Sequence, residues 1–169
     1  MEVLVGDTTV VTGGCDGAVR GAAPTWHAEL SDLMVPLAER LPMDVMVGVT
    51  VWLDNEPRVA AWTSLSAKLA EEAQIIAGAS PNRDVRSTGR SIEVGDLHEV
   101  SLWTECAAEL RLLGIRSVYC LPVLVDGTAV AVFDLYTGRV GAFSDQPVPV
   151  LVDTADRFAE SMRWAVSRP

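Results

Sequence analysis

The stretch that most constrains the fold is residues 117–137, SVYCLPVLVDGTAVAVFDLYT. Two apolar runs meet at Asp126-Gly127, a pair that favours the positive φ angles of a type I′ turn, so the stretch predicts a β-hairpin. Apolar residues occupy neighbouring as well as alternating positions, which indicates strands covered on both faces and central in a sheet. The runs also contain the polar side chains of Tyr119, Asp134 and Tyr136.

The flanking sequence predicts helices on both sides of this hairpin. Apolar residues recur at helical spacing over 26–40, 64–77, 101–113 and 144–166, with Thr25 and Ser144 as N-caps of the first and last helices. Ser80-Pro81 and Gly89 delimit a short helix over 81–88. In the helix 64–77 we expect the apolar stripe to face the core and the charged residues to face solvent; these are Leu65, Leu69, Ala73 and Ile76 against Lys68, Glu71 and Glu72.

Alternating valines predict a second hairpin, with strands over 44–53 and 58–63 joined by a turn at 54–57, and Ile92 and Val94 predict a brief strand. The order of elements favours an α+β fold, a mostly antiparallel sheet flanked by helices. A chain of 169 residues suits one domain. We expect that domain over 25–168 and a flexible, glycine-rich arm over 1–24.

Composition excludes several classes of function. The chain has 13 Lys and Arg against 23 Asp and Glu, a net charge of −10, so we expect no nucleic-acid surface. No apolar stretch approaches the roughly 18 residues of a spanning helix, so we expect no membrane anchor. Cys15, Cys106 and Cys120 form no CxxC pattern, which indicates a reducing cytoplasm and neither a disulfide framework nor a zinc site. We expect no bound metal and no cofactor.

A set of short motifs, in order and at the right spacing, resembles the GAF domain family. It is most similar to the GAF domains of actinobacterial regulators that carry an RNA-binding ANTAR output domain. The motifs are Arg86-Ser87-Thr88-Gly89-Arg90, Val94-Gly95-Asp96-Leu97, Leu113-Gly114-Ile115-Arg116-Ser117, Leu121-Pro122-Val123, Val125-Asp126-Gly127, Asp134-Leu135-Tyr136 and Gly141-Ala142-Phe143-Ser144. Ala79–Asn82 stands where such regulators often carry Glu-Gly-Pro-Cys. The sequence ends at Pro169 without an output domain, so we expect a free-standing module or a part of a longer protein.

The resemblance implies a GAF-like fold with the N- and C-terminal helices packed on one face of the sheet. It also implies a cavity for an unidentified small molecule between the sheet and the helices that follow the second strand. The residues to which it points as the lining are Trp62, Ser64, Arg83, Trp103, Tyr119 and Asp134. The alternative is that the tryptophans are ordinary core residues and that Asp134 is bonded to a neighbouring segment. No cyclic-nucleotide signature and no haem or bilin ligand is present.

Charged and terminal elements add two hypotheses. Arg83, Arg86 and Arg90 surround Asp84 and either hold an anionic ligand or form a solvated helix face. The long apolar stripes of the first and last helices favour a homodimer formed through them. Trp164 falls outside the main stripe of the last helix, so its indole would need a partner to cover it.

The sequence thus favours a sensory or regulatory domain that binds a small molecule or relays a conformational signal to a separate output protein. A ligand-free dimerisation scaffold is one alternative. Another is a free methionine-R-sulfoxide reductase, an enzyme that resembles this chain in size and works through cysteine nucleophiles. No cysteine lies between Cys15 and Cys106, where that enzyme needs one, so we expect no catalytic residues.

Overall fold

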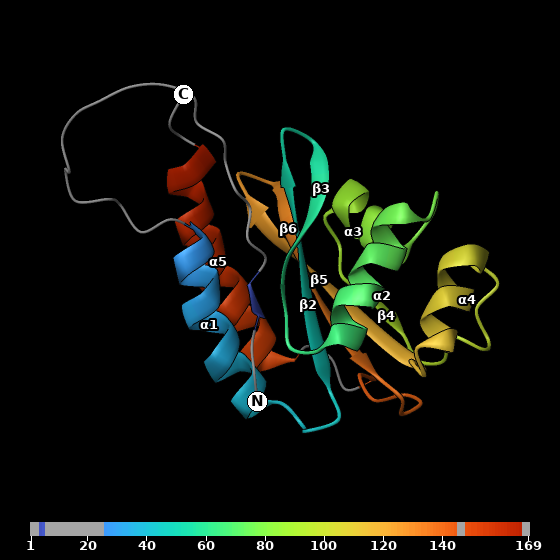
Figure 1. The fold of residues 1–169 in the computed structure, drawn as a ribbon. Helices are drawn as coiled ribbons and strands as arrows, with labels where there is room; N and C mark the ends of the chain where they lie inside the picture. The colour runs from blue at the N-terminus through green and yellow to red at the C-terminus, as the bar shows by residue number, and fades with distance from the viewer. Residues whose placement is uncertain (1–3, 6–25, 145–147, 167–169) are drawn as a thin grey trace.

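The computed structural model describes residues 4–5, 26–144 and 148–166. In these residues one antiparallel sheet has six strands in the order β1-β3-β2-β6-β5-β4 (Figure 1). The strands are β1 (Leu4–Val5), β2 (Met46–Leu53), β3 (Glu56–Trp62), β4 (Ile92–Val94), β5 (Ser117–Val125) and β6 (Thr128–Thr137). The expected α+β architecture is confirmed.

The central hairpin is β5–β6, and its turn is the predicted one. Asp126 and Gly127 have φ angles of 50° and 79°, the left-handed values that a type I′ turn needs. Strand β6 pairs with β5 on one side and with β2 on the other, so the hairpin lies in the interior of the sheet. The second hairpin, β2–β3, turns at Asp54 and Asn55, whose φ angles of 51° and 69° are also left-handed.

The expected flexible arm over 1–24 lies outside the described residues except for β1. Leu4 and Val5 pair antiparallel with Trp62 and Ala61 of β3, so β1 adds an edge strand to the sheet.

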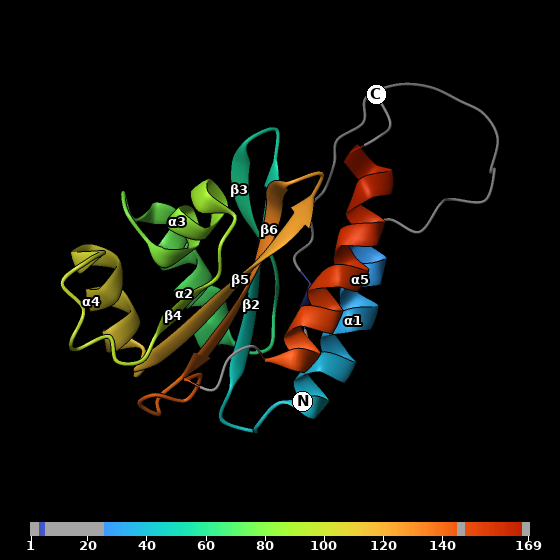
Figure 2. The same cartoon turned by 180° about the vertical axis from the view of Figure 1, so that it is seen from behind.

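Helices α1 (Trp26–Arg40) and α5 (Pro149–Val166) lie side by side on one face of the sheet (Figures 1 and 2), as expected. Phe158 of α5 packs edge-on against Phe133 of β6, with ring centroids 5.9 Å apart. Helix α5 begins at Pro149 and not at Ser144, and the Ser144 hydroxyl donates to the Gly141 carbonyl at 3.0 Å instead of capping a helix. The expected cap at Thr25 and the side chain of Trp164 lie outside what the structure describes.

The opposite face carries α2 (Leu65–Ile76), α3 (Pro81–Thr88) and α4 (Thr104–Leu112), and each face has its own core. Side chains of β6 alternate between them: Phe133 and Leu135 pack toward α1 and α5, whereas Val132 and Tyr136 pack toward α2–α4. Asp134 therefore belongs to the α2–α4 face. No helix in the described ranges is long and apolar enough to span a bilayer.

Candidate functional site

Helix α2 turns two alanines and two polar side chains toward the sheet. Its first turn is capped by Ser64, whose hydroxyl accepts from the Ala67 amide at 3.1 Å. The side chains that it buries are those of Ala67, Ala70, Glu71 and Gln74. The predicted outward position of Glu71 is wrong, because that side chain is fully buried. The helix is rotated so that small alanines and two polar side chains contact the sheet, while Leu65 and Ile76 are exposed.

Gly48 of β2 makes this rotation possible. A Cβ atom at Gly48 would lie 2.2 Å from the Glu71 Oε1 atom and 2.6 Å from its Cδ and Cγ atoms. Glu71 therefore occupies the volume that a side chain at position 48 would fill. Gly48 pairs with Asp134 across β2 and β6, so the same gap brings the Glu71 carboxyl to the strand position of Asp134.

Glu71 and Gln74 are held by hydrogen bonds from the sheet and from α3. The hydroxyls of Thr50 and Tyr136 both donate to Glu71, the latter at 2.6 Å. Gln74 donates through Nε2 to the Tyr136 hydroxyl at 2.7 Å and accepts from the Asn82 amide at 2.9 Å. Two turns of α2 are thereby bonded to β2, β6 and the start of α3.

Helix α3 carries the next member of the site because both of its ends are fixed locally. Ser80 caps its first turn, and Gly89 ends it with a φ angle of 65° that glycine adopts without strain. Asn82, in the first turn, donates through Nδ2 to the Asp134 Oδ2 atom at 2.7 Å. We call these six residues the acidic network: Thr50, Glu71, Gln74, Asn82, Asp134 and Tyr136.

The electrostatics of the acidic network follow from its burial. None of the six residues is more than 2% exposed. Burial, reinforced by the nearby Asp134 charge, raises the pKa of Glu71 well above its ordinary 4.5. Burial also raises the pKa of Asp134 to about 6, although hydrogen bonds from Glu71 and other neighbours lower it in part. Two neighbouring buried carboxylates do not both ionise readily, so the pair favours a state in which Glu71 keeps its proton and can donate it to Asp134.

The acidic network has more acceptors than donors. Asp134 Oδ1 and Asn82 Oδ1 receive no hydrogen bond from the described residues, and the proton on Glu71 can serve at most one of these two atoms. The six residues include no lysine, arginine or histidine, so protons take the place of a counter-charge. Buried acceptors without donors are costly, and the arrangement is suited to a group that brings N–H donors or a positive charge.

Of the six residues to which the resemblance pointed, Asp134 alone belongs to the acidic network. Ser64 is the N-cap of α2, as described above. Arg83 donates to the Ala77 and Ile75 carbonyls at 2.9 and 2.7 Å, which ties α3 to the end of α2. Trp62 is partly exposed at the end of β3, with the Lys68 ammonium 5.1 Å from its ring centroid.

The other two lie elsewhere. Trp103 donates through its indole nitrogen to Asp84 at 2.8 Å and lines a surface pocket next to β4. Tyr119 packs on the opposite face with Phe143, at 6.3 Å between ring centroids. An ideal hairpin with a turn at 126–127 would place Tyr119 across from Asp134. A β-bulge between Val123 and Leu124 shifts the register by one residue, so Tyr119 faces Leu135.

The arginine cluster does not converge on one point. Arg83 is committed to backbone carbonyls, and Arg86 lies over the Trp52 ring at 5.7 Å from its centroid. The geometry therefore gives these two side chains packing and capping roles on the outer surface of α3.

The two described cysteines are not activated. Burial raises the pKa of Cys106 to about 12 and that of Cys120 well above its ordinary value of 9.0. Both thiols therefore stay protonated at neutral pH and are weak nucleophiles. Cys15 lies outside the described residues. Within them, no group of three or more His, Cys, Asp or Glu side chains could hold a metal ion.

Comparison with known proteins identifies the domain type. A GAF domain family model matches residues 20–162, so the chain belongs to the GAF domain family. No curated protein matches the sequence. Among solved structures, a domain of a putative two-component sensor histidine kinase from Sinorhizobium meliloti has a TM-score of 0.64 at 15% identity, with 82% of this chain and 90% of that chain covered.

Two other solved structures show the same fold. The GAF domain region of a putative membrane protein from Geobacter sulfurreducens has a TM-score of 0.65 at 16% identity, with 82% and 93% of the two chains covered. Free methionine-R-sulfoxide reductase from Neisseria meningitidis, solved with its substrate, has a TM-score of 0.61 at 18% identity, with 83% and 81% covered. At these identities the likeness concerns the fold.

Proposed function

We propose that this GAF domain is a sensory module that binds a small molecule at the acidic network and relays that event to an output protein. The single observation that supports this proposal is the burial of Glu71 and Asp134 under α2 and α3, with no basic side chain among their partners in the described residues. A buried carboxyl pair adds little to stability when it lacks a counter-charge. Perturbed acids beneath helices are typical of functional sites.

The acceptor excess defines the ligand class. A ligand with an ammonium, amidine or guanidinium group supplies both N–H donors and the missing positive charge. It would displace the proton shared by Glu71 and Asp134, so binding is coupled to proton release. Because the network is closed, entry requires α3 or the end of α2 to move, and the open form is the minor population that the ligand selects.

Strand β6 provides a route for the relay. Asp134 is the β6 residue of the acidic network that Asn82 of α3 contacts, while its neighbour Phe133 packs on Phe158 of α5 from the opposite face of the same strand. A shift of β6 on ligand binding therefore changes the support of the terminal helices. We propose a homodimer through α1 and α5 as the state that reads this shift, with a separate output protein and a cytoplasmic location. The closeness to actinobacterial regulators stays a prediction from the motifs.

A second candidate is a ligand-free scaffold, which the complete burial of the acidic network favours. The reductase activity has less support, because Cys106 and Cys120 are buried and protonated. An assay with free methionine-R-sulfoxide and a dithiol separates that enzyme from both binding hypotheses.

The test is a thermal-shift screen of small amines, amidines and guanidines against matched carboxylic acids, followed by native mass spectrometry of the freshly purified protein. We expect a cationic compound to raise the Tm of the wild type and to lose that effect in Asp134→Asn. Asp156→Asn, the same substitution at an exposed position on α5, is the control and keeps the full response. Stabilisation by none of the cations, with no bound mass in the native spectrum, would favour the scaffold.

A further inference from the structure

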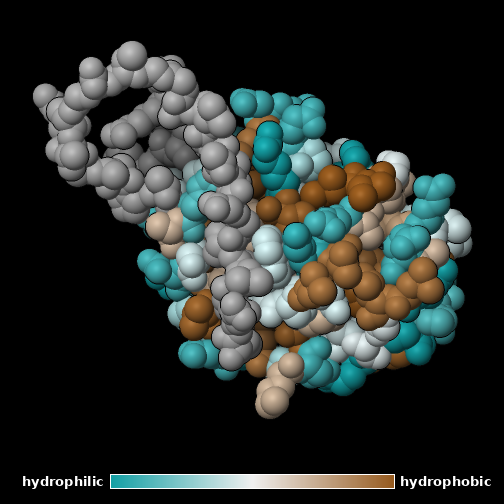
Figure 3. All heavy atoms as spheres, viewed as in Figure 1, coloured by the Kyte–Doolittle hydropathy of each residue, from teal (hydrophilic) through white to brown (hydrophobic). Residues whose placement is uncertain are grey.

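The outward rotation of α2 leaves an apolar surface uncovered. Leu65, Leu69 and Ile76 of α2 are 69%, 40% and 83% exposed, and Leu112 of α4 is 81% exposed. Figure 3 shows hydrophobic residues gathered on the face of the molecule that carries these helices. These side chains lie near one another, unlike the single exposed apolar residues that are ordinary on protein surfaces.

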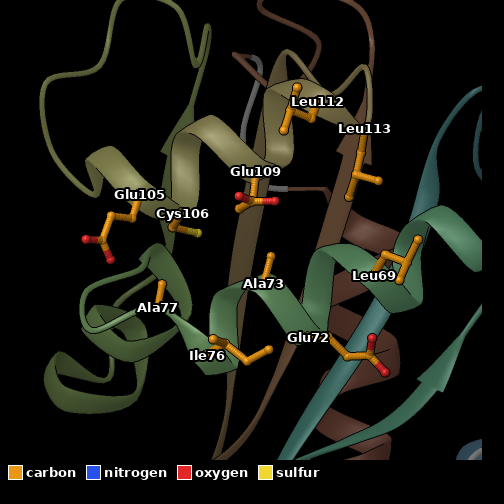
Figure 4. A pocket seen from close by; sticks show the side chains of 10 residues that line it. All are labelled: Leu69, Glu72, Ala73, Ile76, Ala77, Glu105, Cys106, Glu109, Leu112 and Leu113. Atoms are coloured by element: carbon orange, nitrogen blue, oxygen red, sulfur yellow. The ribbon is translucent and has the colours of Figure 1, made fainter.

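Between α2 and α4 this surface deepens into a groove of about 550 Å³. Figure 4 shows its side chains coming from the two helices on either side. Ala73, Ala77 and Cys106 form a floor of small side chains, and Leu69, Ile76, Leu112 and Leu113 form apolar walls. A groove with this lining fits the apolar side chains of a helix better than a polar ligand.

The rim of the groove is acidic. Glu72, Glu105 and Glu109 line it, and no basic side chain does. Glu72 makes an ion pair with Lys68 at 3.6 Å. Glu105 and Glu109 are exposed, stand one turn apart on α4, and make no ion pair with any described residue. The groove therefore combines apolar walls with uncompensated negative charge at its edge.

The charge discriminates among possible occupants. A second copy of this chain placed symmetrically on the groove would bring the same glutamates together, which like-charge repulsion disfavours. The chain's own residues 1–25 contain Arg20 as their only basic side chain, against Glu2, Asp7 and Asp16. Neither occupant complements the rim.

We propose that the groove between α2 and α4 is a docking site for a basic amphipathic helix of another protein. Apolar residues of that helix, spaced at i, i+3 or i+4 and i+7, would enter between Leu69, Ile76 and Leu112. Its lysines or arginines would pair with Glu105 and Glu109. The inference does not depend on the ligand of the acidic network, since it rests on the outer surfaces of α2 and α4.

The test uses three fluorescein-labelled synthetic peptides of 18 residues: a Leu/Lys sequence with helical apolar spacing, its Leu/Glu counterpart, and a scrambled Leu/Lys sequence. Binding is measured by fluorescence anisotropy at several salt concentrations. We expect the ordered Leu/Lys peptide to bind and the other two to bind at least about tenfold more weakly, which corresponds to about 1.4 kcal/mol. Equal binding of the scrambled peptide would overturn the proposal, because charge alone would then account for it, and so would no binding at all.

Variants locate the site. Ile76→Lys with Leu112→Lys should weaken binding of the ordered peptide about tenfold or more, whereas Met43→Lys, at a fully exposed position away from the groove, should leave it unchanged. Glu105→Gln with Glu109→Gln should lower the salt dependence of binding. Hydrogen exchange of the wild type, measured with and without the ordered peptide, locates the binding site without the use of any variant. Protection of α2 and α4 is expected, and protection confined to other elements would refute the site.

Discussion

Gly48→Ala tests whether the acidic network depends on the space beside β2. The new Cβ would lie 2.2 Å from the Glu71 Oε1 atom, so the Glu71 side chain has to leave its position. Its bonds with Thr50 and Tyr136 are then broken, and each buried group left unsatisfied costs about 1–3 kcal/mol. Alanine in a strand gains only about 0.5–1 kcal/mol over glycine. We therefore expect a net loss of about 1–5 kcal/mol.

The assay is urea unfolding followed by tryptophan fluorescence. Gly78→Ala is the matched control, because a Cβ there meets no atom within 4 Å, and we expect its free energy of unfolding to stay at or above that of the wild type. A double-mutant cycle isolates the cause: in a Glu71→Ala background, the clash has been removed, so Gly48→Ala should cost nothing further. An equal cost of Gly48→Ala in both backgrounds would refute the role given to Glu71.

Three further predictions follow from buried groups and from the central turn. The pKa of Asp134 rises from 3.8 to about 6 on folding, so its contribution to stability is complete below pH 3.8 and is lost as the pH rises to about 6. The loss is worth about 3 kcal/mol. It is measured as the change with pH of the difference in unfolding free energy between the wild type and Asp134→Asn. Gly127→Ala, at a φ angle of 79°, should lower the unfolding free energy by about 1 kcal/mol in the same urea assay. Iodoacetamide at pH 8 should leave Cys106 and Cys120 unmodified in the native protein and modify both in urea, as read by peptide mass spectrometry; native modification would show that these thiols are accessible.

Local chemistry explains which parts of the fold could be predicted from the sequence. The turn at Asp126-Gly127 and the caps at Ser80 and Gly89 depend on backbone conformations that a few neighbouring residues determine. Helix α1 has the predicted bounds, Trp26–Arg40, because its apolar stripe also faces the core.

The rotation of α2 could not be predicted in the same way. Its strongest periodic signal is the stripe of Leu65, Leu69 and Ile76, yet the side that enters the protein is decided by the surface it meets. That surface includes Gly48, which leaves room, and Tyr136, which donates to Glu71 from 65 positions away in sequence. The sequence did contain a signal: alanines at 67 and 70 precede Glu71 and Gln74 on one side of the helix, and a glycine interrupts the valines of β2.

The bulge in the central hairpin has a consequence for how residue roles can be transferred between GAF domains. One additional residue in β6 decides whether Tyr119 and Asp134 lie on the same side of the sheet. In an alignment without a gap, a relative whose hairpin lacks that residue would have each β6 position beyond the bulge matched to a side chain in the opposite layer of the domain. A substitution at the bulge changes the stability of the hairpin, whereas an insertion or deletion changes which β6 side chains face each layer. An alignment across this hairpin therefore has to carry a gap at the bulge before any side chain in β6 beyond it can be equated with a ligand contact in another protein.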